Sequence, residues 1–455
     1  GKACGRALRH EAHPSAHRIG LRLAFRPATS SSSPAGRAQA AQLPPHLQSI
    51  VDDYEKRQIE ASSGWLAQLL KSRIAGLAGV GLAGSLMYIL YSFEDVASDV
   101  HALSAACSSR MEPDRARRIW LRIAAWNFLP RDYEKDDPYL ISMPSSGLRF
   151  VSPVGLGAGF DKEAVAPAAF LDMGFASVEV GPVSMASAEA AAKRLEQRQS
   201  RSYIASAAHL GIVGTAIAGN REEMLHLLPV LGKHVDYVTV EIPSVPAGQD
   251  MAQTEQDLLN FVSQVVSTTS AMPAGGPLVF LRLPAACSQM PSKAVTSMAN
   301  RREGLVSAES RLAVAAAGRA ALAGGAAGLV ISAHRDSTAP LERDEVSGSS
   351  WETLFVAELL GEVYRQTGGR LVLFVDGAVE NGQDALSLIE AGASLVQLSS
   401  VLLSAGPQFV RRLKDELSQL LMREGYVSLD EAVGASHRQK RRRGRRRNRW
   451  GKREE

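Results

Sequence analysis

Eight short apolar runs constrain the fold of this chain more than any other feature of its sequence. Most are separated by a segment long enough for a helix, and many are rich in Val, Ile and Leu. Continuous apolar runs are typical of parallel strands that are buried on both faces. We therefore predict an α/β fold in which residues 151–438 form a (β/α)₈ TIM barrel. The predicted strands are 153–157, 177–181, 211–217, 236–242, 277–283, 328–332, 371–375 and 394–398.

The segments between these runs carry helical patterns. The clearest are 163–173, 220–231, 255–266, 311–323 and 354–365. A further segment, 186–198, is rich in Ala, Glu and Arg and predicts an exposed helix. Residues 94–150 precede the barrel and include an amphipathic helix at 112–128, so they predict a small helical cap, with a simple packing helix as the alternative. In a barrel of this kind, the chemistry is expected at the carboxyl ends of the strands.

The N-terminal region combines a basic leader with an uncharged run. Residues 1–45 contain six arginines, one acid (Glu11) and a serine run, which is the composition of a mitochondrial transit peptide; a disordered basic arm is the alternative. After a linker at 46–73, residues 74–93 carry no charge, and twenty helical residues span about 30 Å of hydrocarbon. This predicts a single transmembrane helix at the inner mitochondrial membrane, although a buried glycine-rich helix also fits.

The charge of the chain is unevenly distributed. Its net charge is +4, but the stretch from Arg438 to the end carries eleven Lys or Arg against two acids, so the remainder is acidic. The tail at 439–455 cannot form a packed core. It predicts binding to anionic lipid, RNA or an acidic protein surface, or else a solvated tail. The three cysteines have neither metal-ligand spacing nor a disulfide pattern, so no metal site is predicted.

Four stretches carry a resemblance to a known family. They are the block at 152–184 with its GFDK turn, NGQDALSLIEAGASLVQL at 381–398, LDEAVGASHR ending at Arg438, and RIWLRIAAWNFLPRD before the first strand. Together they make residues 70–438 resemble the class 2 dihydroorotate dehydrogenases, which are quinone-linked and mitochondrial. The resemblance implies oxidation of dihydroorotate to orotate with FMN as cofactor, a serine base and ubiquinone as electron acceptor. It also implies that the cap and the anchor form a quinone tunnel.

The resemblance assigns roles to individual residues. Ser244 falls at the catalytic base, and Lys162 in the GFDK turn falls at a lysine that contacts flavin and substrate. Glu241 falls at a substrate-binding position. The positions of the family's cofactor contacts hold Gly181, Arg282, Gly348, Gly377, Ser399 and Ser400.

Several of these positions depart from the family pattern. The two asparagines that flank the serine base are replaced by Glu241 and Pro246, and other family asparagines by Val213 and Ala333. A glutamate there would repel the substrate carboxylate, and a proline offers no side-chain hydrogen bond.

The phosphate region is altered as well. Asp376 places a negative charge before the phosphate loop Gly377-Ala378, and Trp351 follows Gly348, where it either obstructs the site or packs away. Losing several buried hydrogen bonds, each worth on the order of 1 kcal/mol, would lower ligand affinity by orders of magnitude.

These departures predict a barrel that is degenerate in catalysis. We interpret it as a structural or accessory subunit of an assembly in the inner mitochondrial membrane, in contact with other membrane-complex subunits. One alternative is an active FMN-dependent dihydroorotate dehydrogenase (quinone) of pyrimidine biosynthesis. The other is a barrel that binds a different ligand through Glu241, Arg282 and His334.

Overall fold

The computed structural model describes residues 85, 95, 96, 98, 101–204, 211–242, 251–283, 306–333 and 350–438, all within one compact unit, Leu82–Glu455. The predicted transit segment 1–45, the linker 46–73, the tail 439–455 and, apart from Ser85, the predicted membrane helix 74–93 lie outside the described residues. Among the residues that are described, no helix has the length and apolar character needed to cross a membrane.

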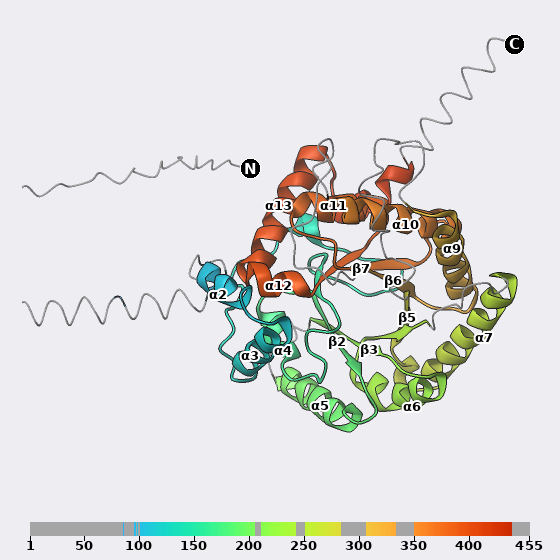
Figure 1. The fold of residues 1–455 in the computed structure, drawn as a ribbon, viewed down its shortest axis with the longest axis horizontal. Coiled ribbons are helices and arrows are strands. Elements are labelled where there is room, and N and C mark those ends of the chain that lie inside the picture. The colour runs from blue at the N-terminus through green and yellow to red at the C-terminus, as the bar shows by residue number, and fades with distance from the viewer. Residues whose placement is uncertain are drawn as a thin grey trace, which may run out of the picture. The chain divides into compact units, whose positions relative to one another are not determined.

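The predicted eight-stranded barrel is confirmed. Its strands are β1 (Val154–Leu156), β2 (Ser177–Val183), β3 (Ile212–Ile217), β4 (Tyr237–Glu241), β5 (Leu278–Leu283), β6 (Gly328–Ser332), β7 (Val372–Asp376) and β8 (Leu395–Leu398). Each strand pairs in parallel with the next, and β1 closes the barrel against β8 through the register Val154↔Val396. Figure 1 shows the helices as a ring around these strands.

Helices connect the strands. They are α4 (Pro167–Asp172), α5 (Ala188–Ile204), α6 (Arg221–Leu231), α7 (Met251–Ser270), α9 (Ala308–Ala323), α10 (Trp351–Thr367), α11 (Gly382–Ala391), α12 (Ser400–Ala405), α13 (Gln408–Glu424) and α14 (Leu429–Ala432). The prediction of an exposed helix at 186–198 is wrong in part, because Ala188, Ala191 and Leu195 of α5 are buried. These residues recur every three or four positions and give the helix a face toward the barrel.

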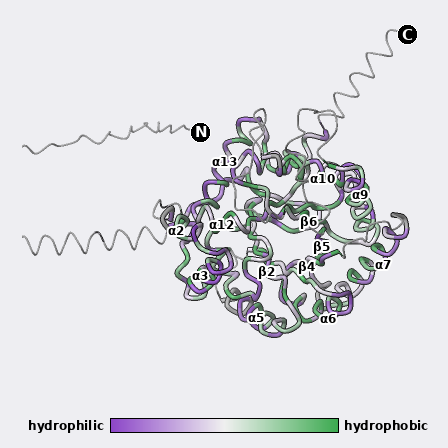
Figure 2. Tube along the Cα trace, in the orientation of Figure 1, coloured by the Kyte–Doolittle hydropathy of each residue, from purple (hydrophilic) through white to green (hydrophobic). Residues whose placement is uncertain are grey.

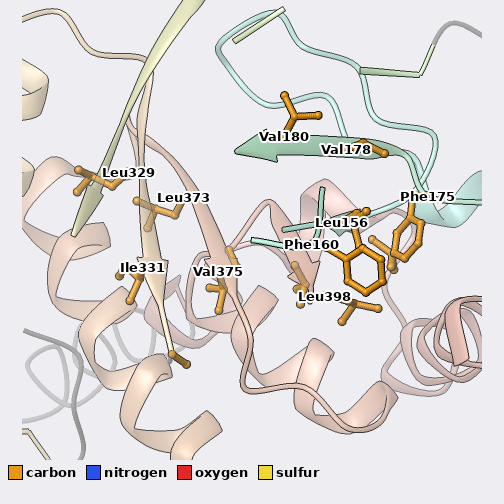
Figure 3. Packing of buried hydrophobic residues seen from close by; sticks show 14 of the residues in the cluster. Leu156, Phe160, Phe175, Val178, Val180, Leu329, Ile331, Leu373, Val375 and Leu398 are labelled. Atoms are coloured by element: carbon orange, nitrogen blue, oxygen red, sulfur yellow. The ribbon is translucent and has the colours of Figure 1, made fainter. Parts of the chain in front are cut away.

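Apolar side chains fill two separate layers. Between the strands and the helices lie the outward-facing residues of the strands, among them Val178, Val180, Leu329 and Ile331 (Figure 3). Figure 2 shows the same division as hydrophobic strands surrounded by helices of mixed polarity. The outer layer holds the helices against the barrel wall.

The second apolar layer fills the inside of the barrel. It contains Tyr237, Phe280 and Phe374, and the rings of Phe280 and Phe374 stack with centroids 4.4 Å apart. Phe150 packs edge-on against Phe374 at 5.8 Å and is fully buried. Because Phe150 precedes β1, it closes the end of the barrel at which the strands begin.

The predicted cap region contains α2 (His101–Ser108), α3 (Pro113–Ala125) and the 3₁₀ turn η1 (Pro138–Leu140). Trp120 of α3 is buried and donates its indole N–H to Ser108 Oγ at 3.0 Å, which joins the two helices. Arg117 donates to the carbonyl of Phe160 at 3.2 Å, so α3 is fastened to the turn that follows β1. Beyond α3, Trp126 and Phe128 are 70% and 75% exposed.

Candidate active site at the barrel mouth

Polar side chains gather where the barrel strands end. Glu179 comes from β2, Arg282 from β5, Asp376 from β7 and Gln397 from β8, above the aromatic layer. Successive residues of a strand face opposite sides of the sheet. Glu179 therefore faces the interior, because its neighbours Val178 and Val180 face the helices. The same alternation directs Arg282 and Asp376 inward.

Arg282 is the centre of this cluster. Its Nη2 lies 2.7 Å from Glu179 Oε1, and its Nη1 lies 2.8 Å from Asp376 Oδ2. Nη1 also donates to Ser332 Oγ at 2.6 Å. Burial lowers the pKa of Arg282, but the charges of Glu179 and Asp376 more than offset burial, so the pKa is raised above its usual value. The guanidinium is therefore permanently charged and engaged by two carboxylates.

The second carboxylate oxygen of Glu179, Oε2, accepts two further hydrogen bonds. Gln397 Nε2 donates to its Oε2 at 2.6 Å, and the Tyr237 hydroxyl donates to the same oxygen at 3.4 Å. Burial, followed by the charge of Glu179, raises the pKa of Tyr237 well above its ordinary value. Tyr237 thus remains a neutral donor, and Glu179, which is fully buried, is held by three side chains.

The GFDK turn lies at the same end of the barrel. Asp161 is buried and accepts hydrogen bonds from the backbone N–H groups of Val165 at 2.8 Å and Ala166 at 3.0 Å. Burial raises the pKa of Asp161, and these hydrogen bonds act in the opposite direction. Lys162 is exposed. Asp161 therefore organises the turn, and Lys162 is the residue of the turn that is available to a ligand.

Gly181 connects this turn to β2. Its N–H donates to the Asp161 carbonyl at 3.0 Å, and its carbonyl accepts from Gly159 N–H at 2.6 Å. Its φ is +110°, and a Cβ placed there would lie 2.4 Å from the Ala216 carbonyl oxygen. Glycine is thus required at 181 by the packing of the backbone itself.

In the predicted phosphate loop, Gly377 adopts a backbone conformation that favours glycine. Gly377 has φ +93°, and a Cβ there would lie 2.7 Å from the Ala333 carbonyl oxygen. Ala378 adopts φ 57°, a region that alanine rarely occupies. The N–H of Gly377 donates to the Gln397 carbonyl at 3.0 Å, and the N–H of Glu380 donates to Asp384 at 3.0 Å. The N–H groups of Gly377 and Glu380 therefore already donate to other groups of the protein.

The remaining predicted residues fall in different places. Glu241 is exposed at the end of β4, in register with Arg282. Ser399 donates to Asp376 Oδ1 at 3.4 Å, and Ser400 is exposed at the start of α12. The positions of Ser244, Pro246, His334 and Gly348 lie outside the described residues, and so does the side chain of Trp351.

The structure corrects two expectations from the sequence. Asp376 was expected to place an unfavourable negative charge beside a phosphate, but it is the last residue of β7 and its carboxylate is paired with Arg282. Val213 was aligned with a family asparagine that, by the resemblance, contacts the flavin, but it packs in the outer apolar layer. The neighbouring Gly214 faces the interior instead, where a Cβ would lie 2.1 Å from Tyr237. A slip of one residue reverses the face of a strand.

Two members of the cluster, Glu179 and Gln397, were not singled out from the sequence. Each is a polar residue inside an otherwise apolar run, which is the signal that identifies an inward-facing polar position. Metal ligation has no support in the part of the chain that the structure describes, where no group of three His, Cys, Asp or Glu side chains is placed to hold an ion.

The fold and the polar cluster place this chain in the class of (β/α)₈ barrel proteins, whose ligand sites lie at the carboxyl ends of the strands. Within that class, the dihydroorotate dehydrogenase family model matches residues 186–421. The chain belongs to the dihydroorotate dehydrogenase family, as its sequence resemblance predicted.

Relatives extend the match across most of the chain. A mitochondrial dihydroorotate dehydrogenase (quinone) of Arabidopsis thaliana is 26% identical over 386 residues, covering 72% of this chain and 80% of its own. A dihydroorotate dehydrogenase (quinone) of Rhodopseudomonas palustris (strain BisA53) is 29% identical over 368 residues, covering 73% and 95%. The crystal structure of DHODH in complex with ferulenol from Eimeria tenella has a TM-score of 0.57 and 23% identity, covering 72% and 96%, and agrees in fold.

The resemblance implies FMN at this mouth, and the described residues fit that cofactor only in part. Gly181 and Gly377 keep conformations that permit close backbone approach. Lys162 of the GFDK turn is an exposed cation, but the second cation at a cofactor-contacting position, Arg282, fits the cofactor less well. Arg282 is engaged by two buried carboxylates, Glu179 and Asp376, so its guanidinium is already paired within the fold. Ala378, in a strained conformation, also replaces a glycine of the family's phosphate loop.

Proposed function

We propose that this chain is a dihydroorotate dehydrogenase-family barrel that has lost flavin-dependent catalysis and serves as a structural or accessory subunit in mitochondria. The observation that carries the proposal is the pairing of Arg282 with both Glu179 and Asp376. An anionic ligand at the mouth would have to compete with two carboxylates that are already desolvated and in contact with the guanidinium. The barrel itself has an intact core, which suits a role that depends on shape.

The leader composition and the names of the relatives support the mitochondrial location in this proposal. Residues 1–45 are arginine-rich and acid-poor, and relatives in Arabidopsis thaliana and Mus musculus are named as mitochondrial. The uncharged run at 74–93 supports attachment to the inner membrane. The exposed Trp126 and Phe128 at the end of α3 provide apolar surface that such attachment would cover. Other subunits of a membrane assembly, and an anionic surface bound by the tail, are the partners in this proposal.

The test is the flavin content and activity of the purified full-length chain. We expect protein without flavin absorbance, and no reduction of quinone when dihydroorotate is supplied together with excess FMN. Protein that retains FMN at one per chain would overturn the proposal. Native electrophoresis of detergent-solubilised mitochondria gives a second readout, and we expect the chain to migrate with a larger assembly and not as a free monomer.

The active quinone-linked enzyme is the second candidate function. It is favoured by the exposed Lys162 on the ordered GFDK turn and by the retained glycine geometry at Gly181 and Gly377. The curated relatives that match most of the chain carry that activity in their names. The same assay separates the two candidates, because the active enzyme would be isolated with flavin and would lose turnover when Ser244 is changed to Ala.

A further inference from the structure

We propose that Arg117 is a positioning residue that couples the cap to the GFDK turn, so that the cap sets the rigidity of the turn that presents Lys162. Arg117 lies on α3, and Lys162 lies in the turn between β1 and α4. This coupling goes beyond the proposed loss of flavin binding, because it does not depend on whether the mouth holds a cofactor.

The inner side of the turn is anchored to the barrel. The ring of Phe160 packs in the outer apolar layer, edge-on against Phe170 of α4 at 5.3 Å (Figure 3). The carboxylate of Asp161 is buried, and its carbonyl accepts from the N–H of Gly181 at 3.0 Å. Phe160 and Asp161 therefore face the barrel, and the next residue, Lys162, is exposed.

Two arginines hold the outer side of the turn, one on each side of Lys162. Arg117 donates to the carbonyl of Phe160 at 3.2 Å, and Arg194 of α5 donates to the carbonyl of Glu163 at 2.8 Å. The side chain of Arg194 is 41% exposed and belongs to a barrel helix, whereas that of Arg117 is 18% exposed and belongs to the cap. Arg117 is thus the residue through which a movement of the cap reaches the turn.

The guanidinium of Arg117 is oriented for this contact. Its Nη2 donates to Asp114 Oδ1 at 3.4 Å, three residues earlier on the same helix. Its Nε is buried without a hydrogen-bond acceptor in the described part of the chain. A hydrogen bond from a charged donor is stronger than one between neutral groups, and partial burial protects it from water. The loss of this bond is therefore expected to loosen the turn.

The cap connects Arg117 to surface that a partner or a membrane can reach. Helix α2 packs on α12, and α3 packs on α12 and α4. Trp120 of α3 donates to Ser108 of α2 at 3.0 Å and ties the two helices together. The exposed Trp126 and Phe128 follow α3 directly. A contact made at these aromatic residues would therefore be transmitted to the turn through α3 and Arg117.

The test is amide hydrogen exchange of the full-length chain, followed by mass spectrometry of peptides that span residues 157–166. In Arg117→Met we expect the amides of Val165 and Ala166, which donate to Asp161, to exchange at least tenfold faster. A tenfold change equals about 1.4 kcal/mol, close to the lower limit for a hydrogen bond from a charged group. Peptides from β4 and β5 are the internal reference and should be unchanged.

Two further variants separate positioning from general destabilisation. Arg117→Lys keeps a charged donor, and we expect it to restore most of the protection of the turn. Arg118→Met is the matched control, because Arg118 is exposed on the same helix, and we expect no change in residues 157–166.

A double-mutant cycle tests the coupling to the cap. Trp120→Phe removes the hydrogen bond that ties α3 to α2. We expect this change to speed exchange in the turn while Arg117 is present, and to have no further effect in the Arg117→Met background. Independent structural roles would instead give additive effects.

Three results would overturn the coupling: unchanged exchange of residues 157–166 in folded Arg117→Met, an equal loss of protection in Arg118→Met, or additive effects of Trp120→Phe. If Arg117→Met does not fold, Arg117→Gln replaces it in the same comparison. The flavin content of the same samples tests the proposed function separately, because FMN bound to the natural protein contradicts that proposal alone.

Discussion

Arg282 on β5 and Asp376 on β7 meet inside the barrel at 2.8 Å, although β6 separates their strands in the closed sheet. Both side chains lie in the interior, which is why two residues far apart in sequence form one electrostatic unit. The unit also includes Glu179, so the arginine bridges three strands at the mouth.

Replacement of Arg282 by Leu is predicted to destabilise the protein strongly. Glu179 and Asp376 would be left buried without their cation, and breaking a buried pair in this way typically costs about 3–5 kcal/mol. Urea denaturation would measure the loss. The matched control is Arg319→Leu, which breaks the partly exposed pair with Glu255 and should cost less than about 1 kcal/mol. Equal losses in the two variants would contradict the structural role of the cluster.

Lys414 is predicted to be a second buried cation that stability depends on. It is buried on α13, and its Nζ lies 2.6 Å from Asp132 Oδ2 and 2.5 Å from Asp136 Oδ1. We expect Lys414→Met to lose about 3 kcal/mol or more in denaturant titrations, because two carboxylates lose their partner. Arg412→Met on the same helix breaks the exposed pair with Glu416 and a cation–π contact with Phe409, and we expect at most about 1 kcal/mol. A mild Lys414→Met variant would argue against this arrangement.

Gly214 is predicted to be intolerant of any side chain. An added Cβ would lie 2.1 Å from the ring of Tyr237, which is fully buried and cannot move aside. We expect Gly214→Ala to cost about 1–3 kcal/mol or more through overpacking, detected as a lower melting temperature. Gly318→Ala on α9 is the comparison, since its Cβ would meet Val363 at 3.3 Å and the change gains helix propensity. Equal melting temperatures for Gly214→Ala and Gly318→Ala would show that Gly214 does not face Tyr237.

Acidification is predicted to weaken the cap through His101. Its side chain is buried and bonded to the Asp95 carbonyl at 2.9 Å; burial lowers its pKa below the usual value, although the contact with Asp95 partly opposes this. The unfolded chain therefore binds a proton at His101 more readily than the folded chain does. The contribution of neutral His101 to the free energy of unfolding is complete above about pH 6.5 and is lost as the pH falls toward the folded pKa.

Unfolding free energies measured as a function of pH would test this effect. We expect His101→Asn to flatten part of the decrease below about pH 6.5. Some decrease should remain, because burial also lowers the pKa of His234. An unchanged pH profile in His101→Asn would show that this side chain does not titrate with unfolding.

The barrel could be predicted from the sequence because its strands are continuous apolar runs, and each observed strand begins and ends within two residues of its predicted position. Burial of individual helix faces was harder to predict. The composition of α5 indicates a helix, but it does not say that Ala188, Ala191 and Leu195 face the barrel. That assignment depends on which side of the helix the strands occupy.

The electrostatics of the site could not be predicted from the sequence. Arg282 and Glu179 are 103 residues apart, and no local pattern indicates that they pair. Asp376 was recognised as an unfavourable charge, but its compensation by Arg282 depends on the inward direction of both side chains. For Val213, a one-residue difference in strand alignment decided which side chain faces the interior.

The pairing of β1 with β8 has a consequence for synthesis of the chain. Val154 lies in register with Val396, and Val396 N–H donates to the Pro153 carbonyl, so one edge of the first strand stays open until the last strand has emerged from the ribosome. Phe150 likewise lacks its ring partner Phe374 until β7 has been synthesised, shortly before β8. A nascent chain halted before β7 would therefore present an unpaired strand edge and an uncovered aromatic ring, features that promote aggregation.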